Sequence, residues 1–364
     1  MKLGFFSPLP PSPSGVADYS AALLRAMRAL GPVRINQPGD IDLYHIGNNQ
    51  LHRPIYERAL ARPGIVVLHD AVLQHFFLGS LDREAYIHEF VHNYGEWSRD
   101  FAGDLWHNRA RSAADRRYFD YPMLKRIAET SRAVIVHNPA ARRIVTRHAP
   151  AARVVEIPHL FDPPRGQSVV DALRFRAQLG LKPRTLVVSV FGHLREAKRL
   201  PIVLRAMRQA WDAGAGAVLL VAGEFVSRDL ERAVAPLLRD PRILRTGHLP
   251  EPDFWRFAAI TDVCVNLRHP AAGETSGIAI RLMGIGKAVA CTTGDEIDRI
   301  PETACLRIDP GVAEQEMLSN MIRWLARERQ CAEEIGRRAA RHIAAHHAPE
   351  SVAQKFWDEI RVHS

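Results

Sequence analysis

Short runs of apolar, mostly β-branched residues alternate along the chain with longer segments of helical periodicity. Runs without a polar residue, such as Ile-Val-Val-Leu at 65–68, are typical of parallel strands that helices cover on both faces. We therefore predict strands at 3–6, 33–35, 43–46, 65–68, 133–136, 154–157, 186–190, 217–221, 242–245, 263–267, 288–291 and 305–308. The alternation indicates an α/β protein with doubly wound, parallel sheets.

A chain of 364 residues is long enough for two domains, each with its own hydrophobic core. Prolines cluster at 158–166, where the periodic patterns pause, so we place the joint between the domains there. The prediction is an N-terminal Rossmann-like domain at 1–160 and a C-terminal one at 167–348. A last helix at 349–362 is expected to pack back on the first domain.

Residues 81–131 break the alternation, because they are helical in pattern and rich in charged and aromatic side chains. They follow a strand end, so we predict a helical insertion above the crevice between the domains. Two interpretations stay open. The insertion shapes an acceptor pocket or touches a membrane surface, or its helices simply pack on the first sheet, since aromatic residues at helical spacing usually form core. The aromatic residues are Tyr86, Phe90, Tyr94, Trp97, Phe101, Trp106 and Tyr118.

The net charge is +9, and only six of the 49 basic residues are lysines. An excess of arginine suits nucleic acid, anionic membranes or phosphorylated substrates, and it also accompanies a GC-rich genome. Because the basic residues are spread along helices without interleaved aromatic side chains, we do not expect nucleic acid as a partner.

No apolar run approaches the ~20 residues that span a bilayer, and the first residues predict a strand rather than a signal peptide. The cysteines lack metal-ligand spacing and lie mostly on predicted apolar strands: Cys264, Cys291, Cys305 and Cys331. We therefore expect no metal, a reduced cytoplasmic location, and at most peripheral contact with a membrane.

Two loops carry the chemistry of the second half. The loop Gly-Glu-Thr-Ser-Gly at 273–277 opens a predicted helix, and free backbone N–H groups at a helix start bind phosphate or another anion. Glu274 beside that site would meet a neutral polar group such as a sugar hydroxyl. A second loop at 191–198 follows a predicted strand and supplies the cations Arg195 and Lys198. Together the two loops predict a site for a diphosphate and a sugar.

Further motifs precede these two loops in the chain: the glycine loop 13–20 (Pro-Ser-Gly-Val-Ala-Asp-Tyr-Ser) and the strand ends 44–49 and 67–70. With the loops 191–198 and 273–277, and the trailing Gly-Lys-Ala-Val, they resemble the motifs of retaining glycosyltransferases of family four, in the family's order. The resemblance covers nearly the whole chain. It implies a GT-B fold, in which two Rossmann-like domains face each other across a crevice.

The same resemblance implies an activity: metal-independent hexosyl transfer, with retention of configuration, from a UDP- or GDP-type sugar. The acceptor would be a glycan, a lipid-linked molecule or a small molecule, and no cofactor is implied. Catalytic roles fall on Lys198 at the departing diphosphate, Glu274 at the sugar hydroxyls and His69 near the reacting centre.

The resemblance also assigns binding residues on both sides of the crevice. The donor-binding residues are expected to be Gly15, His193, Arg195, Lys198, Gly223, Gly247, His248, Glu274, Thr275, Ser276, Gly277, Ile278 and Arg281. The acceptor-binding residues are expected to be Asp18, Tyr19, Asn48, Asn49, His69 and Asp70.

This chain departs from the family at Arg281, which stands where a second glutamate usually binds the ribose hydroxyls. Arginine cannot accept hydrogen bonds, so ribose recognition must change or move. Arg281 reaches a phosphate, pairs with Glu274 or forms part of an altered nucleoside pocket. His193 also stands where an arginine is usual. A nucleotide-sugar epimerase, a sugar phosphorylase and a non-catalytic basic binding module remain alternative functions.

Overall fold

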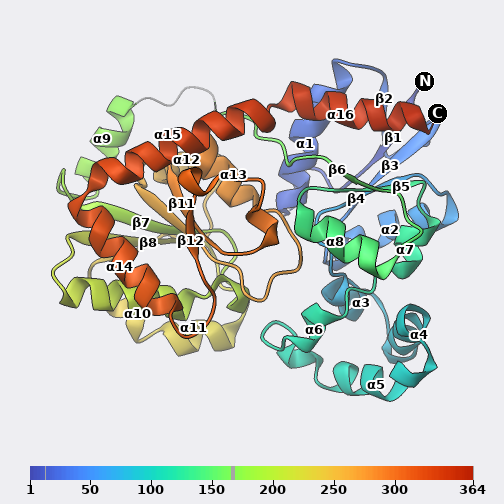
Figure 1. Cartoon of the computed structure of the whole chain (residues 1–364), viewed down its shortest axis with the longest axis horizontal. Coiled ribbons are helices and arrows are strands. Elements are labelled where there is room, and N and C mark those ends of the chain that lie inside the picture. The colour runs from blue at the N-terminus through green and yellow to red at the C-terminus, as the bar shows by residue number, and fades with distance from the viewer. Residues whose placement is uncertain (13, 165–168, 364) are drawn as a thin grey trace.

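The computed structural model describes residues 1–12, 14–164 and 169–363, which form two α/β domains (Figure 1). Each domain is built on a six-stranded sheet in which every pairing is parallel. All the predicted strands are present, each with its ends within two residues of the prediction. The sequence-based expectation of two facing Rossmann-like sheets is therefore confirmed.

The first sheet has the strand order β2-β1-β3-β4-β5-β6. Its strands are β1 (Leu3–Phe6), β2 (Val33–Ile35), β3 (Ile41–Ile46), β4 (Ile65–Leu68), β5 (Ala133–Val136) and β6 (Val154–Glu156). Its helices are α1 (Gly15–Arg28), α2 (Arg53–Ala61), α3 (Gln74–Ser80), α4 (Arg83–Tyr94), α5 (Arg99–His107), α6 (Arg117–Asp120), α7 (Lys125–Thr130) and α8 (Pro139–His148).

The second sheet has the order β12-β11-β10-β7-β8-β9. Its strands are β7 (Leu186–Phe191), β8 (Ala217–Ala222), β9 (Ile243–Arg245), β10 (Val263–Asn266), β11 (Ala288–Thr292) and β12 (Leu306–Ile308). The remaining helices are α9 (Val169–Gln178), α10 (Leu200–Asp212), α11 (Arg228–Val234), α12 (Glu251–Ile260), α13 (Gly277–Gly284), α14 (Glu314–Arg327), α15 (Arg329–His346) and α16 (Pro349–Val362).

The strand order of the second sheet fixes where a ligand can bind. The chain winds from β7 outward through β8 and β9, then returns to β10 on the other side of β7. Ligands of such sheets bind outside the carboxyl ends of the strands where the winding reverses. The loop after β7 is the basic loop 191–198 identified in the sequence. The segment after β10 carries the acidic loop 273–277.

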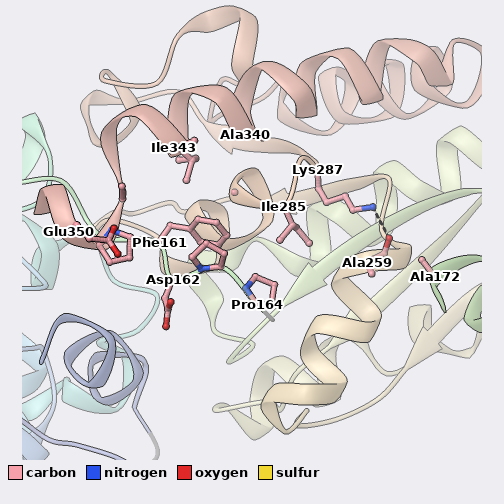
Figure 2. A pocket seen from close by; sticks show the side chains of 15 residues that line it. Phe161, Asp162, Pro164, Ala172, Ala259, Ile285, Lys287, Ala340, Ile343 and Glu350 are labelled. Carbon is pink, nitrogen blue, oxygen red and sulfur yellow. Dashed lines mark hydrogen bonds between the residues drawn. The ribbon is translucent and has the colours of Figure 1, made fainter. Parts of the chain in front are cut away.

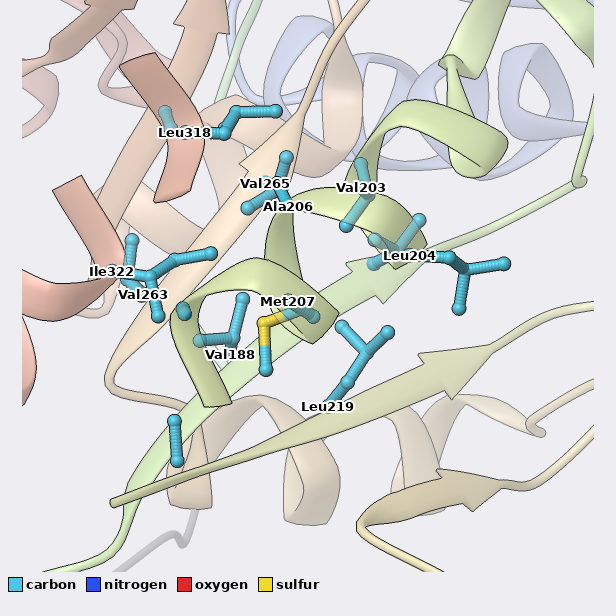
Figure 3. Packing of buried hydrophobic residues seen from close by; sticks show 14 of the residues in the cluster. Val188, Val203, Leu204, Ala206, Met207, Leu219, Val263, Val265, Leu318 and Ile322 are labelled. Carbon is cyan, nitrogen blue, oxygen red and sulfur yellow. The ribbon is translucent and has the colours of Figure 1, made fainter. Parts of the chain in front are cut away.

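The core of the second domain shows why α10 forms where it does (Figure 3). Val203, Leu204 and Met207 recur at helical spacing, so they lie on one face of α10. That face packs on Val188 and Leu219 of the sheet, and all five side chains are at most 2% exposed. Burying a side chain of this size stabilises the fold by roughly 1.5–3 kcal/mol.

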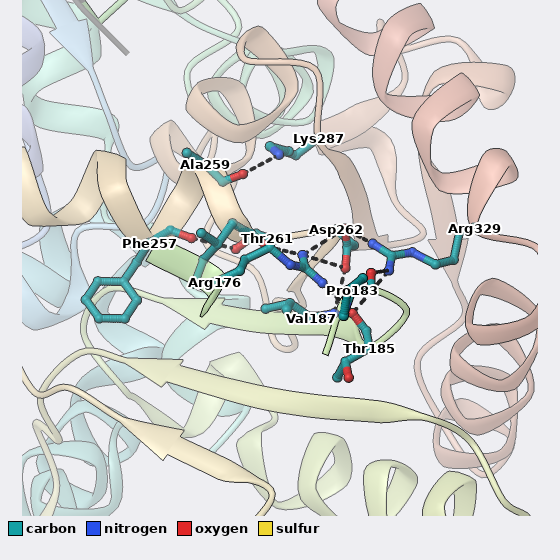
Figure 4. Close-up of polar contacts among 11 residues, drawn as sticks. Arg176, Pro183, Thr185, Val187, Phe257, Ala259, Thr261, Asp262, Lys287 and Arg329 are labelled. Atoms are coloured by element: carbon teal, nitrogen blue, oxygen red, sulfur yellow. Dashed lines mark hydrogen bonds and ion pairs between the residues drawn. The ribbon is translucent and has the colours of Figure 1, made fainter. Parts of the chain in front are cut away.

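A buried polar cluster lies at the opposite, amino end of this sheet (Figure 4). The carboxylate of Asp262, just before β10, pairs with Arg329 at 2.7 Å and with Arg176 at 3.2 Å. It also accepts the backbone N–H of Val187 at 2.7 Å. Arg176 also donates to the carbonyls of Ile260 and Thr185. These bonds join α9, β7, β10 and α15 into one unit, which we call the Asp262 network.

The predicted insertion, 81–131, contains helices α4 to α7, and helices α3 to α6 extend from one end of the first domain (Figure 1). Tyr86, Phe90 and Tyr118 are fully buried in the cluster that also contains Tyr44 of β3. Trp97 is 71% exposed. Most of the aromatic side chains of this segment therefore build core, whereas Trp97 faces outward.

The last helix, α16, lies beside α1 of the first domain (Figure 1). Trp357 is 2% exposed, and its indole Nε1 donates to the carbonyl of Met27 at 3.0 Å. Glu359 pairs with Arg153 at 2.7 Å. Over the described part of the chain, no helix is long and apolar enough to cross a membrane.

Candidate functional site where the two sheets meet

Two loops at the carboxyl edge of the second sheet are tied to each other. The first loop continues from β7 into a short 3-10 helix, Glu196–Lys198, and ends at Arg199, which has a φ of 57°. Arg199 is fixed there by a 2.6 Å ion pair to the fully buried Glu314. The backbone N–H of His269, in the loop after β10, donates to the carbonyl of Ala197 at 2.8 Å. The loops therefore form one platform.

Lys198 is buried at the centre of this platform, where its ammonium donates to the carbonyl of Phe191. Burial, together with the nearby guanidinium of Arg268, lowers the pKa of Lys198 to about 7. A Cβ at Gly192 would lie 3.2 Å from Nζ, so the glycine leaves room for the lysine. Arg195 is exposed and close enough to depress the same pKa. The platform thus gathers positive charge that the protein does not fully compensate.

The acidic motif is held by a residue that the sequence analysis missed. Arg268 follows β10 and donates to Glu274 Oε1 at 2.9 Å, while the N–H of Ala272 donates to Oε2 at 2.7 Å. The Nε of Arg268 is buried and has no hydrogen-bond partner within the described residues. Arg268 could have been predicted from its position, because it follows a strand next to the point where the winding of the sheet reverses.

Helix α13 begins beside this pair. Ser276 is its N-cap, because its Oγ accepts the N–H of Ala279 at 3.3 Å and donates to Asn266 Oδ1 at 3.1 Å. Ile278 approaches Gly192 of the other loop. The first N–H groups of α13 therefore start next to the Lys198 platform, which is the arrangement that binds an anion. A small cavity of about 40 Å³ adjoins them, lined in part by Arg268, Glu274, Thr275 and Ser276.

The first domain contributes a carboxylate to the same place. Burial, together with the neighbouring Glu274 carboxylate, raises the pKa of Asp70 to about 6. Asp70 accepts the N–H of Asn48 at 2.9 Å. Asn48 also caps the start of α3 by accepting the N–H of Phe76 at 2.8 Å. Asn48 therefore positions Asp70, which faces Glu274 from the other domain.

Imidazoles surround Tyr19 at the carboxyl edge of the first sheet. Their ring centroids lie 4.6 to 6.0 Å from that of Tyr19, and they belong to His45, His69, His137 and His159. His69 Nε2 lies 3.0 Å from His45 Nδ1. Burial lowers the pKa of all four histidines, so they are neutral at pH 7 and act through hydrogen bonds. Sequence analysis missed His137 and His159. His137 directly follows the predicted strand 133–136, and His159 lies two residues beyond the predicted strand 154–157.

The two domains are in direct contact at this site. Asn138 Nδ2 donates to the carbonyl of Gly273 and to Thr275 Oγ1, both at 2.9 Å. The N–H of Ala71 donates to the carbonyl of Ala272 at 2.8 Å. Gly273 has a φ of 71°, and a Cβ there would come within 2.8 Å of Ala71. The loop that carries Glu274 is thus docked on the first domain.

The other predicted residues make fewer contacts. A Cβ at Gly223 would be 2.1 Å from the carbonyl oxygen of Gly192, so Gly223 permits the close approach of the β7 and β8 ends. Gly247, with a φ of 68°, precedes α12, and His248 and His193 are exposed. Gly15 begins α1 in open space, and Asn49 caps the short helix at Gln50–His52.

Arg281 does not pair with Glu274, which was one of the options left by the sequence. Its guanidinium donates to Glu251 Oε1 at 2.7 Å and lies over the rings of Phe254 and Trp255. Glu274 is instead paired with Arg268, as described above. The reason is distance along α13, because Arg281 lies on the second turn of this helix and Glu274 precedes its first turn.

A wide pocket of about 710 Å³ lies away from this site, at the hinge between the domains (Figure 2). It is lined mostly by apolar side chains, among them Phe161, Ile285 and Ile343. None of the predicted catalytic, donor-binding or acceptor-binding residues lines it. This pocket adjoins the C-terminal end of α13, whereas the anion site lies at the start of that helix. The larger cavity is therefore not the anion site.

No metal cluster is formed in the described ranges 1–12, 14–164 and 169–363, where no three His, Cys, Asp or Glu side chains are grouped to hold an ion. No protein-family model matches the sequence, and no curated protein matches it. The fold, with two facing doubly wound sheets and loops that meet at their carboxyl ends, is GT-B.

Solved structures of the same fold cover essentially the whole chain. HepE from Anabaena, in complex with UDP and glucose, superposes with a TM-score of 0.65 at 15% identity over 100% of both chains. Sucrose-phosphate synthase from Thermosynechococcus elongatus gives 0.67 at 16% identity over 99% of this chain and 98% of that one. WaaG, a glycosyltransferase of lipopolysaccharide biosynthesis, gives 0.65 at 14% over 96% and 98%. At these identities the similarity establishes the fold.

Proposed function

We propose that this protein is a glycosyltransferase that moves a hexose-type sugar from a nucleoside-diphosphate sugar to an acceptor. The observation that carries the proposal is the meeting of Lys198, Arg268 and the start of α13 beside Glu274. Cations and free helix amides suit a departing diphosphate, and a carboxylate suits sugar hydroxyls. The structure of HepE, which was crystallised with UDP and glucose, supports the same class of ligand for this fold.

The family-four motifs support retention of configuration through front-face displacement. The acceptor oxygen would bond to the anomeric carbon as the bond from that carbon to the diphosphate breaks, and the acceptor proton would pass to a diphosphate oxygen. Lys198, Arg195 and the amides of α13 would hold the charge of the leaving group without a metal ion. His69, as a neutral imidazole, would bond a hydroxyl of the sugar or the acceptor.

The acceptor would enter over the first domain, along Asp18, Tyr19, Asn48, Asn49 and Asp70 and below the helical insertion. We propose a glycan, a lipid-linked molecule or a small molecule in this role. The resemblance also favours UDP or GDP in the donor and a cytoplasmic protein with at most peripheral membrane contact. Contacts between the domains, such as the one at Asn138, would help exclude water and limit hydrolysis of the donor.

A thermal-shift panel of UDP, GDP, ADP, dTDP and their common sugar conjugates tests the proposal. A ligand that binds only the native state at a hundredfold excess over its Kd stabilises it by about 2.7 kcal/mol. We expect one nucleotide family to raise Tm and Lys198→Met to reduce the shift clearly. A flat panel at millimolar ligand would overturn the proposal.

The same panel leads to the alternative functions, because each predicts a different reaction of the donor that binds. A transferase needs an acceptor, an epimerase converts the donor alone, and a phosphorylase needs free phosphate. NMR of the incubated donor separates these three outcomes and, for a transferase, reads the anomeric configuration of the product. A basic binding module would give salt-sensitive binding to anionic surfaces and no response to nucleotide sugars.

A further inference from the structure

A carboxylate outside the recognised motifs is held in place by Arg281. Glu251 begins α12, and its Oε1 accepts the guanidinium of Arg281 at 2.7 Å and the indole N–H of Trp255 at 3.0 Å. The guanidinium lies 4.0 Å from the ring centroid of Phe254 and 4.3 Å from that of Trp255. Two aromatic faces and one ion pair therefore fix the arginine, and the arginine fixes the glutamate.

The second oxygen of Glu251 is available to a ligand. Both donors bond to Oε1, and within the described residues the structure gives Oε2 no hydrogen-bond partner. The Glu251 side chain is 56% exposed, whereas that of Arg281 is 23% exposed. The cluster thus presents one oriented acceptor atom to solvent on a rigid base.

The cluster lies one helical turn from the anion site. Arg281 follows Gly277 by four residues, so both lie on one face of α13, ~6 Å apart along the axis. That face is turned toward the first domain, because a Cβ at Gly277 would lie 3.6 Å from His159 Nε2. Asp18 of α1 is close to the cluster too, since burial and then Glu251 raise its pKa, and Arg281 lowers it. Glu251 therefore lies where the two domains approach each other.

This geometry matches the layout of a nucleoside diphosphate, in which the pentose is bonded directly to the first phosphate. A diphosphate at the start of α13 would bring its pentose to about the level of Arg281. A vicinal diol offers two O–H donors, and a carboxylate oxygen accepts them well, whereas a guanidinium accepts none. We propose that Glu251, positioned by Arg281, binds the ribose 2′- and 3′-hydroxyls of the donor, an inference that rests on the proposed function.

The test compares UDP with 2′-deoxy-UDP, and GDP with 2′-deoxy-GDP, by titration calorimetry on the full chain. A hydrogen bond to a charged group accounts for about tenfold in affinity or more, so wild-type protein should bind the ribonucleotide about tenfold more tightly. In Glu251→Ala the ratio of the two Kd values should fall to near one. Arg281→Lys should lower the same ratio, because lysine lacks the stacked, planar guanidinium.

The matched control is Asp253→Ala, which removes a carboxylate of the same helix that pairs with Arg256 at 3.1 Å. Its ratio should equal that of the wild type. Glu251→Gln keeps an oxygen for Arg281 and guards against loss of folding, and it too should lower the ratio. A ratio that is unchanged in both Glu251 variants overturns this inference and leaves the proposed function intact. Failure of wild-type protein to bind these four nucleotides or any other nucleotide of the thermal-shift panel overturns the proposed function itself.

Discussion

The second domain carries a group of cations at each end of its sheet, and the two groups differ in how completely they are paired. At the amino end, the Asp262 network gives Arg176 a carboxylate and two carbonyls, and Arg329 shares the same aspartate. At the carboxyl end, Lys198 has only a carbonyl as hydrogen-bond partner among the described residues, and Arg268 keeps a buried Nε without one. Paired cations hold the fold together, whereas underpaired cations attract an anion.

The largest effect is expected from breaking the paired group. Arg176→Met removes a cation that is 9% exposed and leaves Asp262, whose side chain is 17% exposed, with one partner fewer. Removing one member of a buried ion pair costs about 3–5 kcal/mol, so the free energy of unfolding in urea should fall by that amount. Arg174→Met, on the exposed face of the same helix, is the control and should change it by less than ~0.5 kcal/mol. Equal stability of the two variants would refute a structural role for the network.

The next effect comes from removing a cation of the underpaired group. Lys198→Met should lower the rate of sugar transfer about 10²–10³-fold, as expected when one preorganised donor to a developing charge is lost. Its Tm should not fall, because burial already disfavours the charged lysine. The control is Lys287→Met, which removes a partly buried lysine whose ammonium donates to the carbonyl of Ala259 at 2.6 Å outside the site (Figure 4). Similar loss of transfer in both variants would contradict the comparison.

The pH dependence of nucleotide binding sharpens the same contrast. The lysine must be charged to bind a diphosphate, and the pKa of Lys198 is lowered to about 7 from its ordinary 10.5. As pH rises above 7 the unliganded protein loses that proton, so the Kd of the nucleotide should rise, by at most about tenfold per pH unit. Calorimetry between pH 6 and 9 should show this slope in wild type and not in Lys198→Met. A Kd that does not change above pH 7 would show that the charge on Lys198 does not control nucleotide binding.

The smallest effect is expected at the contact between the domains. Asn138→Asp keeps the oxygen that caps α8 at Ala141 and removes the two donors to Gly273 and Thr275. The free energy of unfolding should fall by about 1 kcal/mol, and amide exchange of the 273–277 loop should become faster. Asn49→Asp is the control, because Asn49 caps a helix inside the first domain. If exchange in the loop is the same in both variants, Asn138 does not dock it.

The sequence predicted the sheets and the two loops of the site for a physical reason. Strands that are covered on both faces have sequences of consecutive apolar residues. The strand β4, Ile65–Leu68, matches its prediction at both ends. Lys198 and Glu274 were predicted because one lies in a basic loop after such a strand and the other in a glycine-flanked loop that opens a helix. Each of these features is local in sequence.

The missed features are partnerships between distant residues. Nothing near Arg281 in sequence indicates that its partner is Glu251, 30 residues away, or that two rings of α12 would stack on it. The same holds for His137 beside Tyr19. Such pairs depend on how helices pack across a sheet, and residue type alone does not specify that packing.

The most direct test of the central claim is titration calorimetry of UDP and GDP against wild type, Lys198→Met and Lys287→Met at pH 6.5. Underpaired cations at the carboxyl edge predict that one nucleotide binds wild type and Lys287→Met with the same Kd. Lys198→Met should weaken that binding about tenfold or more, as expected for a charged hydrogen bond. Binding of equal strength to Lys198→Met, or none to the wild type, would contradict the account.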